Sequence, residues 1–152
     1  MSGKSDNGKK ILLMKATLTG WGGDTSGKPY RVIAIPEDFT LYQLAMAIVD
    51  SFNFDFDHSF GFYNNIKQWT NSTVKYELHP DFDAKGVESI KVKEVFNRIR
   101  RKVLFLFDYG DSWYFVVELV GREKPEENVK YPMVKESVGE SPKQYWYAKE
   151  EE

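Results

Sequence analysis

Two aspartates that flank a glycine near the middle of the chain are the first candidates for chemistry. Asp108 and Asp111 stand on either side of Gly110. A carboxylate pair at this spacing could hold a metal ion or act in acid–base catalysis. The same spacing is typical of a hairpin turn, because Asp side chains accept hydrogen bonds from nearby backbone N–H groups and Gly tolerates positive φ. Both interpretations stay open, and the neighbouring Tyr109 and Trp113 complete this set of candidate binding residues.

The histidine at position 58 follows two aspartates and is the next candidate. Asp55, Asp57 and His58 could together supply three metal ligands, whereas a lone histidine on a surface segment more commonly packs against its neighbours. The chain has 2 histidines and no cysteine, and protein zinc sites draw mainly on these two residue types. We therefore count His58 among the candidate binding residues, assign no metal ligand and expect no cofactor.

One basic cluster could contact nucleic acid. Its cations could bind phosphates while aromatic side chains of the aspartate turn stack on bases. The alternative is the solvated C-terminal end of a helix. The formal net charge of −2 disfavours broad nucleic-acid binding, although a local basic face is compatible with it. The cluster consists of Arg98, Arg100, Arg101 and Lys102.

Composition limits the class of protein to which the chain can belong. A length of 152 residues suits one domain with its own core, and an aromatic share of 16% favours a sheet-rich core. The lack of cysteine excludes disulfides, thiolate metal sites and cysteine nucleophiles. Because no apolar run is long enough to span a bilayer, we expect a soluble cytoplasmic protein with no membrane partner.

The N-terminal part of the chain predicts two strands followed by a helix. Apolar, β-branched residues favour strands over 11–18 and 30–35, which a glycine-rich loop joins. Thr40 and Gln43 match a capping box, in which two side chains satisfy free backbone N–H groups at the start of a helix. Apolar residues then recur at helical spacing as far as Phe52, so one face of this helix should be buried.

The remainder of the chain predicts further strands around a shorter helix. The strand expected over 113–120 is apolar on both sides, which is typical of a central strand covered on both faces. Residues 131–147 contain two prolines and should be irregular. We further expect strands over 60–63, 73–78 and 103–107, a helix over 91–100, and loops over 83–88 and 121–128.

These elements predict one α+β domain over residues 11–147. A disordered polar tail over 1–10 should precede it and a charged tail over 148–152 should follow it. We expect a mostly antiparallel sheet of about six strands that starts in ββα order, with two helices on one face.

Four blocks of the sequence resemble the plasmid ORF-3-like family of the Ri-plasmid type. The most distinctive is the run Asp-Tyr-Gly-Asp-Ser-Trp, which is similar to the family pattern Y-D-F/Y-G-D-x-W. Together the blocks span about residues 12–147. They are Tyr30–Pro36 with Thr40 and Leu41, His58 with Phe62, 108–113, and 131–145.

The chain departs from the family pattern at two histidine positions. Phe115 stands where the family often has a histidine two residues after the tryptophan, and Ala45 stands where the family's helix carries one. Members of the family are mostly uncharacterised, and some carry a resolvase-like label through association with mobile elements. The resemblance therefore implies a shared fold and shared residues, but it does not indicate a particular reaction.

The residues and the resemblance together favour a non-enzymatic binding or interaction module, linked to mobile elements or nucleic acid. The alternative is a metal-dependent or acid–base hydrolase that uses Asp108, Asp111 and His58. The two hypotheses differ in one geometric expectation, since the hydrolase requires these three side chains to converge in one cleft. Partners other than nucleic acid are not indicated by the sequence.

Overall fold

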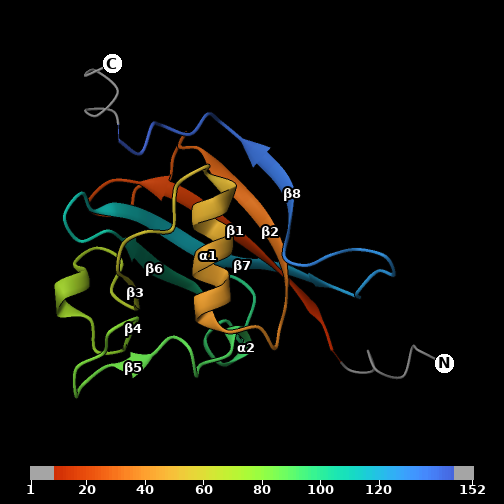
Figure 1. Cartoon of the computed structure of the whole chain (residues 1–152), viewed down its shortest axis with the longest axis horizontal. Coiled ribbons are helices and arrows are strands. Elements are labelled where there is room, and N and C mark those ends of the chain that lie inside the picture. Colours follow the sequence, from red (N-terminus) through yellow and green to blue (C-terminus); the bar gives the residue numbers. More distant parts are fainter. Residues whose placement is uncertain (1–8, 146–152) are drawn as a thin grey trace.

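Residues 9–145 fold into one eight-stranded sheet and two α-helices (Figure 1). The computed structural model describes residues 9–145, so the predicted tail 148–152 and most of the predicted tail 1–10 lie outside the described residues. The helices are α1 (Leu41–Ser51) and α2 (Val92–Val95). The strands are β1 (Ile11–Thr19), β2 (Tyr30–Pro36), β3 (Phe60–Tyr63), β4 (Lys75–Glu77), β5 (Lys85–Gly86), β6 (Lys102–Phe107), β7 (Trp113–Glu123) and β8 (Met133–Val138).

The sheet is larger and less regular than the sequence predicts. Its order is β5-β4-β3-β6-β7-β1-β2-β8, and the β4–β5 pair is parallel while the other pairs are antiparallel. The expectation of about six strands was therefore wrong. The expectation of loop over 83–88 was wrong at 85–86, where β5 forms, and that of an irregular segment over 131–147 was wrong at 133–138, where β8 forms. Residues 146 and 147 of that segment lie outside the described residues. Both missed strands lie at an edge of the sheet. Edge strands are short or charged, so they lack the apolar alternation that marks a strand in sequence.

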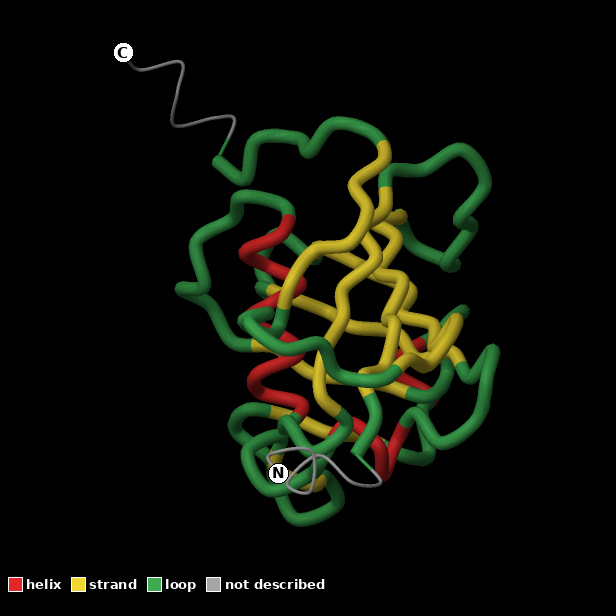
Figure 2. The backbone as a smooth tube through the Cα atoms, turned by 90° about the vertical axis from the view of Figure 1, so that its right-hand side faces the viewer, coloured by secondary structure: helices red, strands yellow, loops and turns green. Residues whose placement is uncertain are grey.

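The predicted ββα opening is confirmed, and α1 begins where its capping box indicates. The Thr40 hydroxyl accepts a hydrogen bond from the Gln43 N–H at 3.2 Å, and the Gln43 side chain accepts one from the Thr40 N–H at 2.9 Å. The helix lies along one face of the sheet (Figures 1 and 2). Its buried side chains are Leu41, Leu44, Ala45, Ile48 and Val49.

The second helix is a single turn, so the expectation of a helix over 91–100 was wrong after residue 95. The side chain of Phe96 is buried and ends the turn. Arg100 then adopts a positive φ of 78° and its N–H donates to the Leu119 carbonyl at 2.7 Å. The backbone groups that a longer helix would pair internally thus form hydrogen bonds with the neighbouring strand β7 instead.

The core lies between the helices and one face of the sheet, and aromatic rings fill its centre. Phe105 of β6 contacts Phe62 of β3 and Phe115 of β7, with ring centroids 4.8 and 5.5 Å apart. Strand β7 is central, as predicted, but its second face is covered only in part. On that face Val116 is buried whereas Val120 is 39% exposed.

A smaller cluster on the opposite face of the sheet ties β3, β4 and the β6–β7 turn together. The buried Tyr63 hydroxyl donates to a Glu77 carboxylate oxygen at 2.5 Å and lies 2.7 Å from the Tyr109 hydroxyl. Burial raises the pKa of Tyr109 to about 12 and raises that of Tyr63 as well. The Trp69 ring packs on both phenol rings, at 4.8 and 5.9 Å. These hydroxyls occupy the space over Gly61, which has no side chain.

Replacing Gly61 with Ala should lower the free energy of unfolding by about 1–3 kcal/mol, because an added methyl group overpacks a filled site. Its Cβ would lie 2.7 Å from the Tyr63 hydroxyl and 2.8 Å from the Tyr109 hydroxyl. Gly20→Ala is the matched control, since a Cβ at Gly20 meets nothing within 4 Å. Urea denaturation of both variants measures the difference, and equal stabilities would contradict this packing.

Candidate functional site

Asp108 is buried and acts as the acceptor that closes the β6–β7 turn. It has a positive φ of 69°, and one carboxylate oxygen accepts hydrogen bonds from the N–H groups of Gly110 and Asp111, at 3.0 and 3.2 Å. The N–H of Ser112 donates to the Asp108 carbonyl at 2.6 Å. An Asp in the left-handed region that bonds its own turn is the arrangement that the hairpin-turn interpretation describes.

His58 lies directly beside this turn and joins a polar cluster. Its Nε2 atom is 3.4 Å from the second Asp108 carboxylate oxygen, 2.9 Å from the Tyr145 hydroxyl and 3.6 Å from Asp57. The Tyr145 hydroxyl donates to Asp57 at 2.6 Å. The structure therefore brings together two of the three residues that the hydrolase hypothesis names.

Asp111, the third of those residues, stays apart from the cluster. It is exposed, and its bond to Asp108 runs through its backbone N–H rather than its carboxylate. Within residues 9–145, three or more His, Asp or Glu side chains nowhere gather in an arrangement that could hold a metal ion. The convergence that the hydrolase hypothesis requires is thus incomplete.

The two aromatic residues of the turn point to opposite faces of the sheet. Tyr109 packs with Tyr63 and Trp69, as described above, and is 40% exposed. Trp113 lies on the core side, where its ring centroid is 4.8 Å from that of Phe54. The two rings therefore cannot form one stacking platform.

The basic cluster lies at the far end of β6 from the turn. Strand β6 separates Lys102 from Phe107 by about 17 Å. Arg100 pairs with Glu118 at 3.6 Å, and the Arg101 side chain is half-buried. The predicted surface, with phosphate contacts beside stacked bases, is therefore not assembled, because its cations and its aromatic rings are a strand length apart.

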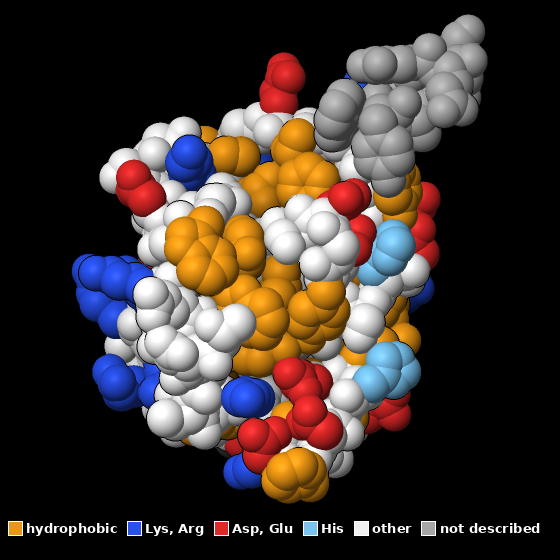
Figure 3. Space-filling view, turned by 90° about the vertical axis from the view of Figure 1, so that its left-hand side faces the viewer, with side chains coloured by type: hydrophobic (Ala, Val, Ile, Leu, Met, Phe, Trp, Pro, Cys, Tyr) orange, Lys and Arg blue, Asp and Glu red, His pale blue; other side chains and the backbone are white. Residues whose placement is uncertain are grey.

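An exposed aromatic surface lies at the end of the sheet that carries the β6–β7 turn. Trp21 is 60% exposed, and its ring meets that of Tyr114 edge-on at 5.9 Å. Figure 3 shows hydrophobic side chains gathered over the middle of this end, with acidic side chains below them and Lys and Arg side chains along the left border. Charges of both signs therefore surround this apolar surface.

Gln144 is a buried residue that sequence reasoning missed. Its side-chain oxygen accepts from the Asp55 N–H at 2.6 Å, and its side-chain nitrogen donates to the Asp55 carbonyl at 3.1 Å. One amide thus satisfies both backbone groups of a residue 89 positions away. The only sequence signal was the position of Gln144 inside a block of family resemblance.

Arg31 holds the segment that carries Gln144. Its guanidinium is buried and donates to the carbonyls of Ser51, Val138 and Gly139, at 2.9, 3.2 and 3.0 Å. It also donates to the Ser141 hydroxyl at 2.9 Å. Burial lowers the pKa of Arg31, and its donor groups are matched by acceptors from the end of α1 and from the C-terminal segment.

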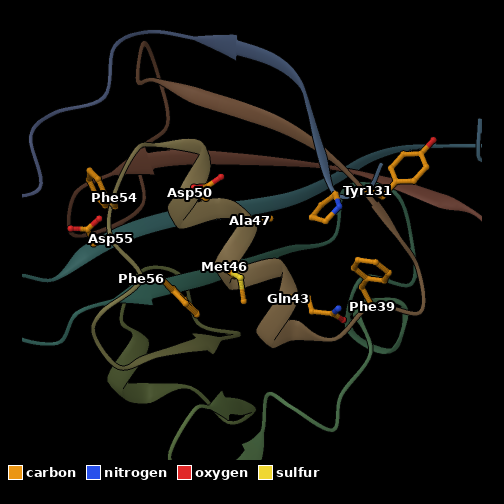
Figure 4. Close-up of a pocket in the computed structure, with 10 residues that line it drawn as sticks. Phe39, Gln43, Met46, Ala47, Asp50, Phe54, Asp55, Phe56 and Tyr131 are labelled. Atoms are coloured by element: carbon orange, nitrogen blue, oxygen red, sulfur yellow. The ribbon is translucent and has the colours of Figure 1, made fainter. Parts of the chain in front are cut away.

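A groove of about 780 Å³ runs along the outer side of α1 (Figure 4). It does not include the turn at 108–113. One wall is the outward face of α1, and the opposite wall includes the segment 54–56, whose backbone Gln144 holds. The lining residues are Phe39, Gln43, Met46, Ala47, Asp50, Phe54, Asp55, Phe56, Tyr131 and Pro132.

The polar cluster around His58 and the groove share one segment of the chain, residues 54–58. The Phe56 ring stacks on that of Phe107 at 6.1 Å, directly before the turn that Asp108 closes. Phe54 packs on Trp113, directly after that turn. Since His58 and Gln144 fix the same short segment by hydrogen bonds, the candidate residues predicted from the sequence support one wall of the groove.

Comparison with known proteins identifies a family and a fold. The family model described as plasmid pRiA4b ORF-3-like protein matches residues 15–144. The structure is similar to the crystal structure of a protein of unknown function, MM3350 from Methanosarcina mazei Go1, with a TM-score of 0.72 and 21% sequence identity. This match covers 93% of the present chain and 79% of the other, and at such identity it shows the fold alone.

A search of curated proteins finds no match.

The part of the chain that the structure describes contains no helix with the length and apolar character that crossing a membrane requires.

Asp108→Ala should lower the free energy of unfolding by about 1–3 kcal/mol, because two partly buried N–H groups lose their acceptor. Asn in place of Asp108 keeps an acceptor and tolerates positive φ, so Asp108→Asn should lower the free energy of unfolding by less than about 1 kcal/mol. Asp111→Ala, the matched control, should stay within about 0.5 kcal/mol of the unsubstituted protein. Thermal and urea unfolding measure all three, and an Asp111→Ala loss as large as that of Asp108→Ala would refute the capping role.

Proposed function

This chain belongs to the plasmid pRiA4b ORF-3-like family, and we propose that it is a non-enzymatic binding module whose ligand occupies the groove along α1. The observation that carries the proposal is the lining of the groove. Most of its side chains are apolar or aromatic, and a few polar groups stand among them. A concave apolar surface with sparse polar groups is the usual form of a ligand site.

The exposure of the groove wall supports binding of a partner. Met46 lies in the middle of α1, points outward and is 41% exposed. Phe39 and Phe56 are only partly buried and flank the same groove. Apolar side chains held open in a concavity leave hydrophobic area that a ligand can remove from water, at about 25 cal/mol per Å².

The chemistry of the neighbouring polar cluster supports binding rather than hydrolysis. Both Asp108 carboxylate oxygens already face partners, one the turn N–H groups and the other His58. Residues 9–145 place no histidine, serine or threonine in the groove lining. A general base needs a reactive group within hydrogen-bond reach of a bound substrate, and the groove offers only Asp50 and Asp55 for that role.

A link to mobile elements rests on the plasmid named in the family description. A direct role in nucleic-acid binding has less support, because the described residues that line the groove include no Lys or Arg and phosphate recognition depends on such cations. The partner proposed here is therefore not nucleic acid.

Selection from a random phage-displayed peptide library on the immobilised protein tests the proposal. Selected peptides should bind the unsubstituted protein and lose at least about tenfold in affinity to Met46→Glu, because a charge in the apolar groove must be desolvated. Glu keeps the helix, being a good helix former. Val134→Glu is the matched control, since Val134 is 42% exposed on β8 and lies outside the groove.

Two results would count against the proposal. The first is failure to select any peptide whose binding depends on Met46. The second is hydrolysis of a panel of chromogenic phosphate and carboxylate esters that His58→Ala and Asp111→Ala each abolish while both variants stay folded, since this would restore the hydrolase hypothesis.

A further inference from the structure

Resting on the proposed function, we infer that the groove along α1 accepts a protein segment with apolar side chains followed by Lys or Arg, with the cation over the C-terminal end of α1. The inference concerns the chemistry of the partner. It stands on the apolar lining of the groove and on the two carboxylates at one end of it.

The groove has apolar side chains along its length and carboxylates at one end. Its α1 wall consists of Gln43, Met46, Ala47 and Asp50, which share one helical face at spacings of three and four residues. Figure 4 shows Asp50 and Asp55 on opposite walls at the end where α1 finishes, with Phe54 beside Asp55 and with Phe39 and Tyr131 toward the other end. A ligand that fills the groove therefore meets apolar surface along its length and a carboxylate on each wall at one end.

Neither of these carboxylates is neutralised within the described part of the chain. No ion pair or side-chain hydrogen bond joins Asp50 or the Asp55 carboxylate to residues 9–145, and the groove lining contains no basic residue. Gln144 bonds only the backbone of Asp55. By contrast, Asp38 at the opposite end of α1 pairs with Lys93 at 2.9 Å and with Lys9 at 3.6 Å.

The end of α1 has no cation within its own last turn. Cations usually offset the partial negative charge of a helix C-terminus, yet the last turn of α1 has no basic residue and contains Asp50. Arg31 of β2 supplies the offsetting charge, since its buried guanidinium donates to the Ser51 carbonyl. The attraction for a cation on the groove side therefore comes from the carboxylates of Asp50 and Asp55.

The size of the groove fits a short segment of protein. Gln43 and Asp50 are seven residues apart on α1, which places the two ends about 10 Å from one another. That span matches about two turns of a partner helix, and helix-in-groove recognition uses apolar anchors at such spacing. Nucleic acids and anionic membrane surfaces are disfavoured, because their phosphates would face the two carboxylates.

Comparison of two peptide selections tests the inference. The random phage-displayed library is selected in parallel on the unsubstituted protein and on Asp50→Asn/Asp55→Asn. Peptides from the first selection should be enriched in Lys and Arg on one side of their apolar residues, and those from the second should not. Synthetic peptides from the first selection should bind the double variant about three- to tenfold more weakly, with a smaller difference at high salt.

Matched variants keep this result separate from the proposed function. Glu88→Gln/Glu140→Gln changes the net charge equally at exposed positions outside the groove, and it should leave peptide affinity unchanged. Peptides that depend on Met46 but show no basic enrichment would overturn the inference and leave the binding module intact. The absence of any Met46-dependent peptide would overturn both.

Discussion

The hydrogen bonds between Gln144 and the backbone of Asp55 are the interaction on which the candidate site depends. Residues 54–58 run from the end of α1 to β3 without a partner strand, so sheet pairing cannot satisfy their backbone groups. An unpaired buried peptide group costs about 1–3 kcal/mol. The C-terminal segment supplies what is missing, and Arg31 holds that segment against the end of α1. The C-terminal segment is thereby joined to residues 54–58 at one wall of the groove.

Strand geometry explains why the cluster of aspartates and aromatics does not act as one site. Side chains alternate between the faces of a sheet, so residues before and after a tight turn are sent to different environments. Tyr109 joins the hydroxyl cluster on one face, while Trp113 packs beside Phe54 on the other. Asp108 remains between them, buried, with its oxygens committed to the turn and to His58. The most distinctive sequence block, 108–113, thus serves mainly to fix the backbone of the β6–β7 turn.

Sequence reasoning succeeded where local physical rules decide the structure. The capping box at Thr40, the apolar stripe of α1 and the turn at Asp108 each depend on residues within a few positions of one another. It failed at β8 and β5, whose pairing is fixed by the sheet and not by their own residues. It also failed at Gln144, because a bond between positions 89 residues apart leaves no periodic trace. The groove follows from that bond, so it could not be predicted either.

The two walls of the groove are held by different contacts, and these contacts bear on how the groove can bind. The α1 wall is fixed by the buried side chains of the helix and by its capping box. The opposite wall is fixed by the rings of Phe54 and Phe56, which pack on five neighbouring rings, and by the Gln144 amide, which bonds the Asp55 backbone. Close packing resists displacement, so both walls hold their backbone in place. Asp55 itself is exposed, so its side chain is the part of this wall that can turn toward a bound cation.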